Sequence, residues 1–235
     1  MSIGFIDSGI GGLTTLCDCI KAYPHNDYVY IADTLYAPYG SKSKEFLTDR
    51  ANALIDKLKR LGAKAVVFAC NSCSSATAHT HMNGIPVIRV LPHPEEVLKQ
   101  TKGKALLLAT PVTINSKVVK DVSHERLTKA ANDCLAMMIE ECAPDFFRLK
   151  RYIKELLAPY SDYEAVIAGC THYIYLIGII KELFPQFKVC HSNGETVEKL
   201  KEFSQEKGQG RVDIHITGKG DKEKYYGIID SLLSV

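Results

Sequence analysis

Short apolar runs without polar alternation recur along the chain and are separated by longer segments of mixed polarity. Runs of this kind are typical of parallel strands that are buried on both faces. Because such strands alternate with helices in α/β proteins, the pattern predicts an α/β fold with mostly parallel sheets. The predicted strands are Ile3–Ile6, Tyr28–Ile31, Ala65–Ala69, Pro86–Val90, Ala105–Ala109, Ala165–Ala168, Phe187–Cys190 and the less apolar Val212–Ile216.

Apolar residues between several of these strands recur with the spacing of amphipathic helices. In the segment Thr48–Leu61 they fall on one helical face, every third or fourth residue. The same spacing predicts helices over Leu176–Phe184, Thr196–Phe203 and Lys222–Leu233. The apolar face of the first helix consists of Ala51, Leu54, Ile55, Leu58 and Leu61.

Two segments have neither helix nor strand periodicity. Lys201–Arg211 is polar and contains two glycines, so it is predicted to be a loop. Leu91–Pro94 contains two prolines, which end a strand and delay the next helix. We therefore predict a hinge there, with a subdomain boundary near residue 93.

The chain contains one internal repeat with an offset of 100 residues. Ala65–Ser72 resembles Ala165–His172, and a cysteine stands at the same point of both copies. A second, weaker similarity relates Ile3–Ser8 to Leu106–Pro111. Each half of the chain thus has an opening strand that ends in a small polar loop, and a later strand that ends in cysteine.

Composition excludes several classes of protein. The 235 residues are 46% hydrophobic and 24% charged, which is typical of a folded globular chain. A net charge of +2 gives no indication of nucleic-acid binding. No segment approaches the ~18 apolar residues that cross a bilayer, and the first residues lack the features of a signal peptide. We therefore expect a cytoplasmic protein without a membrane segment, whose eight cysteines form no disulfide framework.

Cys70 and Cys170 both stand where a predicted strand ends, and polar residues that can begin a helix follow each of them. The start of a helix offers unpaired N–H groups, which lower a thiol pKa and can hold a carboxylate. If the two halves pack face to face, the thiols lie on opposite sides of one cleft. One thiolate could then remove a proton from a carbon atom while the opposite thiol delivers one, which yields the mirror image.

Each thiol needs a partner to ionise near neutral pH, and two candidates are close in sequence or in the predicted sheet. Asp7 closes the strand that we expect beside the Cys70 strand, and His172 is two residues after Cys170. Each residue alone also has a structural interpretation, as a helix cap, a turn or a buried side chain. Gly9–Thr14 lacks the third glycine of a dinucleotide-binding fingerprint, so it predicts no nucleotide site.

A zinc or redox site is an alternative interpretation of the same cysteines. Cys70-x-x-Cys73 and Cys170-x-His172 together supply four soft ligands, and three cysteines with one histidine are a zinc combination. The Cys-x-His spacing is tighter than in typical structural zinc sites. Cys70 and Cys73 alone could also form a redox pair after a strand.

Taken together and in order, several segments resemble the cofactor-independent glutamate racemases of the aspartate/glutamate racemase superfamily. The likeness extends over most of the chain. Thr110 and Thr113 fall where this family has a threonine-bearing loop, and Ile139-Glu140 fits the place of a family glutamate. The segments that carry the resemblance are Ile3–Thr14, Ala32–Thr34, Pro38–Gly40, Ala69–Ser72 and Gly169–Tyr173.

The resemblance implies two pseudo-symmetric α/β subdomains with the active site in the cleft between them. The first would comprise residues 1–93 and 193–235, and the second residues 94–192. The implied acid and base are Cys70 and Cys170, assisted by Asp7, His172 and Glu140. The implied substrate-binding residues are Ser8, Pro38, Tyr39, Gly40, Asn71, Ser72, Thr110, Thr113 and Thr171.

The same resemblance implies interconversion of L- and D-glutamate, with D-glutamate supplied to bacterial peptidoglycan. It implies neither pyridoxal phosphate nor a metal, and it is compatible with a homodimer. Departures from the family pattern, such as Cys73 and Ile174, leave aspartate or another amino acid open as the substrate. A weakly active relative that binds an amino acid for regulation would keep the same motifs.

Overall fold

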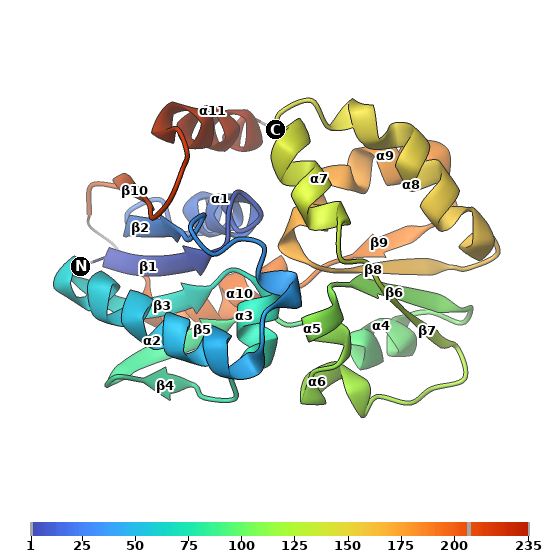
Figure 1. The fold of residues 1–235 in the computed structure, drawn as a ribbon, viewed down its shortest axis with the longest axis horizontal. Helices are drawn as coiled ribbons and strands as arrows, with labels where there is room; N and C mark the ends of the chain where they lie inside the picture. Colours follow the sequence, from blue (N-terminus) through green and yellow to red (C-terminus); the bar gives the residue numbers. More distant parts are fainter. Residues whose placement is uncertain (1, 206–207, 235) are drawn as a thin grey trace.

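Two β-sheets form the centres of the two halves of the molecule, as the computed structural model of residues 2–205 and 208–234 shows (Figure 1). The first sheet has the order β10-β2-β1-β3-β5-β4 and the second the order β7-β6-β8-β9. Every neighbouring pair is parallel except β4 and β5. The strands are β1 (Ser2–Asp7), β2 (Asp27–Ala32), β3 (Ala63–Phe68), β4 (His81–Met82), β5 (Ile85–Arg89), β6 (Ala105–Ala109), β7 (Leu127–Ala131), β8 (Ala165–Gly169), β9 (Lys188–Cys190) and β10 (Val212–Ile216).

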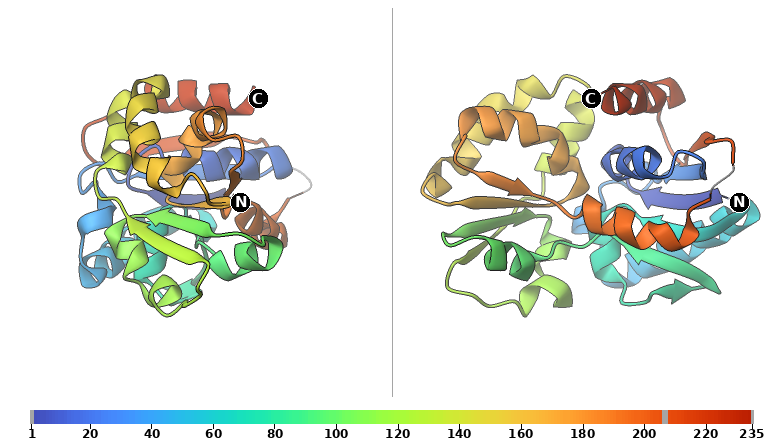
Figure 2. Two further views of the ribbon diagram at one scale, coloured as in Figure 1. Left: turned by 90° about the vertical axis from the view of Figure 1, so that its right-hand side faces the viewer. Right: turned by 180° about the vertical axis from the view of Figure 1, so that it is seen from behind.

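Helices cover both faces of each sheet, which confirms the predicted α/β fold (Figures 1 and 2). On the first sheet, one face carries α1 (Leu13–Ala22), α10 (Asn193–Leu200) and α11 (Lys222–Leu233), and the other carries α2 (Lys44–Arg60) and α3 (Asn71–Ala76). On the second, one face carries α7 (Leu135–Cys142), α8 (Lys150–Leu157) and α9 (Ile177–Leu183), and the other carries α4 (Pro94–Gln100), α5 (Pro111–Ile114) and α6 (Lys117–Lys120). Short 3₁₀ turns are η1 (Tyr39–Ser41), η2 (Phe146–Leu149), η3 (Ala158–Tyr160), η4 (Thr171–Leu176) and η5 (Lys201–Phe203).

One apolar cluster continues from the first half of the molecule into the second. It includes Phe5 and Leu16 on one side and Leu106 and Ile139 on the other, all of them fully buried. Burying a side chain of this size contributes about 1.5–3 kcal/mol. The two halves therefore share a packed core, and this core fixes the loops that face each other between the sheets.

The two sheets repeat one arrangement, because β2-β1-β3-β5 corresponds to β7-β6-β8-β9. Gly4 pairs with Val66 in the first sheet, and Leu106 pairs with Val166 in the second. Counted from these pairs, Ser8 corresponds to Thr110. The predicted alignment of the two segments paired Ser8 with Pro111, and it therefore differs from the structural alignment by one residue.

Several predicted boundaries differ from the structure. β7 was not predicted, because its residues are half-exposed and include Thr128 and Lys129; the short β4 was also missed. α2 begins earlier, where the Ser43 hydroxyl caps the helix by accepting from Phe46 N at 3.1 Å. Leu61 lies beyond its end and is 38% exposed, so its predicted place on the apolar face is wrong. The predicted loop Lys201–Arg211 begins with η5, and its residues 206–207 lie outside the described part of the chain.

The chain crosses between the halves twice. The first crossing joins β5 to α4, which packs on the second sheet. The second joins β9 to α10, which packs on the first sheet and beside α1. On this basis we propose that the subdomain boundaries lie near residues 93 and 193.

Over residues 2–205 and 208–234, no helix combines the length and the apolar character needed to cross a membrane.

Candidate active site

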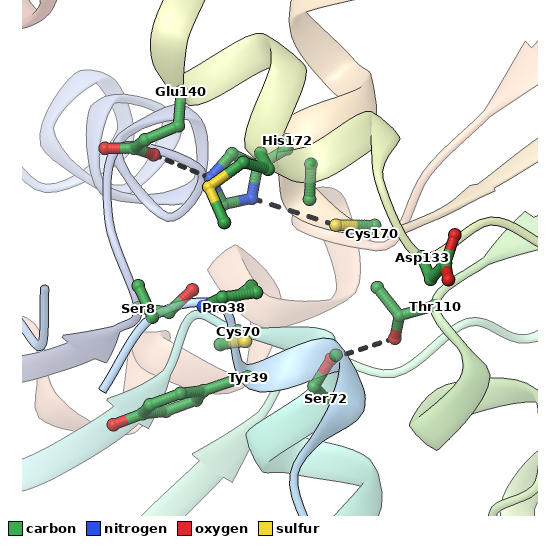
Figure 3. Close-up of a pocket in the computed structure, with 14 residues that line it drawn as sticks. Ser8, Pro38, Tyr39, Cys70, Ser72, Thr110, Asp133, Glu140, Cys170 and His172 are labelled. Atoms are coloured by element: carbon green, nitrogen blue, oxygen red, sulfur yellow. Dashed lines mark hydrogen bonds and ion pairs between the residues drawn. The ribbon is translucent and has the colours of Figure 1, made fainter.

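A small cavity lies between the two halves, at the carboxyl ends of the central strands. Its walls come from the loops that follow β1, β3, β6 and β8, together with η1 and α7 (Figure 3). It measures about 30 Å³, which is room for a few water molecules at roughly 10–15 Å³ each on this measure. The lining residues are Ser8, Ala37, Pro38, Tyr39, Gly40, Cys70, Ser72, Thr110, Asp133, Ala136, Met137, Glu140, Cys170 and His172.

Both cysteines of the repeat line this cavity. Cys70 follows β3 directly before α3, and Cys170 follows β8 directly before η4. They lie on different walls, one from each half of the molecule (Figure 3). Their side chains are almost fully withdrawn from solvent, with 6% and 5% exposed. Two thiols from equivalent places in two sheets thus face one small space.

Cys170 begins a chain of polar contacts that ends at α7. Its Sγ lies 3.8 Å from His172 Nδ1, and His172 Nε2 lies 2.9 Å from Glu140 Oε2. The same carboxylate oxygen accepts a hydrogen bond from Ile10 N at 2.9 Å. The chain therefore connects the second half of the molecule to the loop after β1 in the first.

Two glycines of that loop allow this close approach. A Cβ atom at Gly9 would lie 2.3 Å from the Glu140 carboxylate, and one at Gly11 would lie 2.4 Å from His172 Nδ1. Any larger side chain at either position would push the pair away from the cavity. The glycines of the opening motif therefore serve to seat the histidine and the glutamate.

The electrostatics of His172 and Glu140 favour a charged pair. Burial lowers the pKa of His172, but contacts with Cys170 and Glu140 outweigh it and hold the pKa well above the ordinary value. Burial raises the pKa of Glu140, but the hydrogen bond with His172 outweighs it and the pKa is lowered. Near neutral pH, His172 is therefore an imidazolium beside the Cys170 sulfur.

Cys70 has a different environment. Burial and then the negative charge of Asp7 raise the pKa of the Cys70 thiol well above its usual value. Asp7 itself is fully buried, and its Oδ1 accepts from Gly9 N at 2.8 Å. Burial raises the pKa of Asp7 as well. Cys70 is therefore held as a protonated thiol.

A row of hydroxyl groups crosses the cavity floor from one half to the other. Ser72 Oγ and Thr110 Oγ1 are hydrogen-bonded at 2.9 Å, and Thr110 Oγ1 donates to Thr113 Oγ1 at 3.2 Å. Asn71 points elsewhere, because its Nδ2 donates to Val90 O at 3.1 Å. Thr171 Oγ1 donates to Asp7 Oδ2 at 3.5 Å.

The predicted site residues thus fall into two groups. Ten line the cavity, and four lie behind its wall. The four are Asp7, Asn71, Thr113 and Thr171. The catalytic and substrate-binding roles of all fourteen residues remain predictions.

The segment with Pro38, Tyr39 and Gly40 is anchored from below by a buried carboxylate. Tyr39 Oη donates to Asp33 Oδ2 at 2.5 Å, and Arg50 forms two hydrogen bonds with the same carboxylate at 2.8 and 2.6 Å. Thr217 Oγ1 donates to Asp33 Oδ1 at 2.6 Å. Burial raises the pKa of Asp33, but these bonds outweigh it and the pKa is lowered. A charged group with every lone pair satisfied therefore fixes one wall of the cavity.

We expect Tyr39→Phe to lower the free energy of unfolding by about 2 kcal/mol, because it removes a hydrogen bond to a buried, charged carboxylate. Urea unfolding followed by circular dichroism measures this. The control is Tyr36→Phe, since Tyr36 stacks with Arg50 and its hydroxyl has no hydrogen bond within the described residues. Equal losses in both variants would show that the Asp33 contact does not hold the loop.

The lining residues that sequence reasoning missed are Ala37, Asp133, Ala136 and Met137. Ala136 and Met137 precede Glu140 by four and three positions in α7, so they share its face of the helix, whereas Asp133 lies in the bend before α7. Counting back from Glu140 at helical spacing would have found Ala136 and Met137. Asp133 is exposed at the cavity, and within the described residues its carboxylate has no hydrogen bond or ion pair.

The donor set for a zinc site does not come together. Cys73 is 1% exposed and packs in the apolar core beneath α2, away from the cavity. In the described part of the chain, no three His, Cys, Asp or Glu side chains are grouped to hold a metal ion. All eight cysteines are free, so Cys70 and Cys73 form no disulfide.

Several known proteins are similar to this chain in sequence and in structure. No protein-family model matches the chain. It is 32% identical to the glutamate racemase of Carboxydothermus hydrogenoformans, covering 97% of this chain and 91% of that one. It is 30% identical to the glutamate racemase of Clostridium perfringens, covering 90% and 89%. The crystal structure of glutamate racemase from Francisella tularensis in complex with D-glutamate superposes with a TM-score of 0.80, at 25% identity over 100% of this chain and 94% of that one.

Proposed function

Because the chain belongs to the glutamate racemase family, we propose that it interconverts L- and D-glutamate by moving the α-proton between Cys70 and Cys170. The observation that carries the proposal is the pair of buried thiols on different walls of one cavity. The D-glutamate complex of the Francisella tularensis relative supports the choice of substrate. The chain is accordingly an isomerase.

The chemical step moves one proton on and one proton off the α-carbon. A thiolate on one side takes the α-proton, and the electrons of the broken C–H bond spread into the α-carboxylate. The thiol on the opposite side then gives its proton to the carbon, so one S–H bond forms as the other breaks. The configuration is inverted, and nothing is oxidised or reduced.

The two thiols have different neighbours. Cys170 Sγ lies 3.8 Å from Nδ1 of the His172 imidazolium, which is placed to meet negative charge on that sulfur during the reaction. Cys70, whose pKa is raised by burial and by Asp7, carries the proton that is to be delivered. We propose that Cys170 is the base and Cys70 the acid when the first substrate binds, and that the roles exchange after one turnover.

Substrate binding requires the walls to move apart. The cavity of about 30 Å³ has too little room for an amino acid with its two carboxylates. We propose that the α-carboxylate binds at the start of α3 and η4, near Asn71, Ser72 and Thr171, because the first N–H groups of a helix have no carbonyl partner within that helix. Ser8, Tyr39, Gly40, Thr110 and Thr113 would surround the rest of the substrate. Closure then excludes water while the proton moves.

Asp133 offers a binding place for the α-ammonium group. Of the two carboxylates that line the cavity, Glu140 is paired with His172 and Asp133 is unpaired within the described residues. We expect Asp133→Asn to raise KM for glutamate about five-fold, the effect of one partly solvated charge contact, with a smaller change in kcat.

Steady-state kinetics with both enantiomers checks the Asp133 prediction. The matched control is Asp145→Asn, because Asp145 is exposed near the other end of α7 and does not line the cavity. An unchanged or lowered KM in Asp133→Asn would show that this carboxylate does not hold the ammonium group.

The experiment that tests the function is incubation of the protein with L-glutamate in deuterated water, without added pyridoxal phosphate or metal. We expect deuterium at the α-carbon and D-glutamate in the same samples. Activity on aspartate alone would keep the mechanism and change the substrate. No turnover of any amino acid in a panel would refute the proposal and favour a regulatory binding protein.

A supply of D-glutamate for peptidoglycan is the proposed use of the reaction. A bacterial strain that needs external D-glutamate for growth tests it. Expression of this chain should allow growth without the supplement. Expression of a Cys70→Ala variant at equal level should not.

A further inference from the structure

Ile10, in the loop between β1 and α1, is held by the second half of the molecule through both of its backbone polar groups. Its N–H donates to Glu140 Oε2 at 2.9 Å, and its carbonyl accepts from Tyr175 Oη at 2.8 Å. Glu140 belongs to α7 and Tyr175 to η4. One fully buried residue of the first half therefore meets two elements of the second.

Tyr175 shares a short turn with His172. Residues three apart in a 3₁₀ turn lie one above the other, and His172 and Tyr175 have this spacing in η4. Both side chains contact the loop after β1, His172 against Gly11 and Tyr175 at Ile10. The position of the tyrosine on this loop therefore helps to set the position of the histidine.

These contacts form a closed ring. Glu140 Oε2 accepts from Ile10 N and lies 2.9 Å from His172 Nε2. The turn then leads from His172 to Tyr175, whose hydroxyl returns to Ile10 O. Because each contact in a closed network limits the movement of the others, the ring keeps the imidazole where its Nδ1 is 3.8 Å from Cys170 Sγ.

Tyr175 is itself well fixed, although it does not line the catalytic cavity. Its ring stacks on that of Phe146, with 4.7 Å between the ring centroids and 28° between the planes. Burial raises the pKa of its hydroxyl well above the usual value, so the hydroxyl stays a neutral donor. Any effect of this hydroxyl on the reaction must therefore pass through the residues of the ring.

We propose that Tyr175 is a positioning residue for racemisation, which holds the His172–Glu140 pair beside Cys170 by binding the Ile10 carbonyl. This inference rests on the proposed function. Without the hydroxyl the ring of contacts opens, and the imidazole can move away from both Glu140 and the sulfur. The imidazolium then meets the charge on Cys170 less closely while the thiol takes or gives the α-proton.

The variant Tyr175→Phe tests the proposal, because it keeps the ring on Phe146 and removes only the hydroxyl. Contacts with Cys170 and Glu140 hold the pKa of His172 above its usual value, so a looser pair should lower that pKa by about 0.5. An NMR titration of protein labelled with ¹³C in its histidine rings measures this, and the signal of His172 is the one missing in His172→Asn. We also expect kcat to fall about five-fold for both enantiomers, with KM within about two-fold.

The charged and titratable neighbours of His172 are the same in this variant as in the unchanged protein. They are Cys170 in front of η4, Glu140 of α7, Asp7 of β1 and Lys224 of α11, which donates to Glu140 O at 3.1 Å. A lowered pKa of His172 in Tyr175→Phe therefore reports the lost hydroxyl and not a lost charge.

Tyr23→Phe is the matched control. Tyr23 follows α1, and its partly buried hydroxyl donates to Val197 O of α10 at 3.0 Å, so the same kind of bond is lost within the first half. We expect both variants to lose a similar free energy of unfolding in urea. Tyr23→Phe should leave the pKa of His172, kcat and KM unchanged.

The proposal is overturned if Tyr175→Phe leaves the pKa of His172 unchanged, or if Tyr23→Phe lowers it as much. A raised KM with an unchanged kcat in Tyr175→Phe would also overturn it, because that result would place the hydroxyl on the substrate. The titration needs no turnover. If the unchanged protein does not racemise glutamate, the proposed function fails, and a lowered pKa in Tyr175→Phe still supports the positioning of the pair.

Discussion

Alanine at Cys70 or at Cys170 is expected to lower kcat for racemisation of glutamate by about 10⁴-fold, the upper range for loss of a general acid or base. Each thiol serves one face of the α-carbon, and we expect closure around the substrate to exclude the water that could replace it. Chiral chromatography of the product from each enantiomer measures the loss.

The two alanine variants should also differ from each other in a way that a folding defect cannot imitate. The thiol that remains can still remove a proton and return a deuteron on the same face. In deuterated water, the Cys70 variant should therefore label one enantiomer without inverting it, and the Cys170 variant should label the other. The mechanism is wrong if either variant labels both enantiomers or racemises at the wild-type rate.

Cys73→Ala is the control for both. Cys73 lies one turn along α3 from Cys70, but it packs in the core and not in the cavity. We expect its activity to stay within about two-fold of the unchanged protein, at most a small stability effect. A loss as large as that of Cys70→Ala would instead favour a redox pair between Cys70 and Cys73.

His172→Asn is expected to lower kcat by about 10²–10³-fold, because it removes the imidazolium beside Cys170. The loss should be largest for the enantiomer whose α-proton Cys170 removes. His79→Asn is the matched control, since His79 is exposed on a loop and does not line the catalytic cavity. Equal activity with both enantiomers in His172→Asn, at the wild-type level, would exclude the imidazolium from the mechanism.

The same substitution has a consequence for stability that depends on pH. The folded pKa of His172 is raised above its unfolded value of about 6.5. A group of this kind stabilises the fold fully below the unfolded pKa, and this contribution is lost as the pH rises through the folded pKa. The stability difference between the unchanged protein and His172→Asn should therefore be larger at about pH 6 than at about pH 9. Urea unfolding at both pH values tests the sign.

The strands buried on both faces were predictable because their sequence is apolar throughout, as in Ala105–Ala109. β7 was not, because Thr128 and Lys129 give a half-exposed edge strand the polarity of a loop. The cysteine pair was visible as a repeat within the chain. Its position at equivalent places of two sheets is the physical reason why the repeat could be seen at all.

The partners of the two cysteines could be predicted only in part. His172 was visible because it is close to Cys170 in sequence. Glu140 was found through the family resemblance alone, since its contact with Ile10 joins residues 130 positions apart. Asp133 was missed because its place at the cavity depends on how α7 is turned, which tertiary packing decides. The direction of Asn71 depends likewise on the position of Val90 O in the crossing segment.

One thiol lies near an imidazolium and the other near a buried carboxylate. This difference between the two walls can affect kcat and KM for the two enantiomers in one way only. L- and D-glutamate have equal free energies in water, so detailed balance requires the same kcat/KM in both directions. If the unequal environments of Cys70 and Cys170 make kcat differ between the two enantiomers, KM must therefore differ between them by the same factor. An enzyme built from two unlike halves can have a higher kcat with one enantiomer, but its KM for that enantiomer is then higher by the same factor.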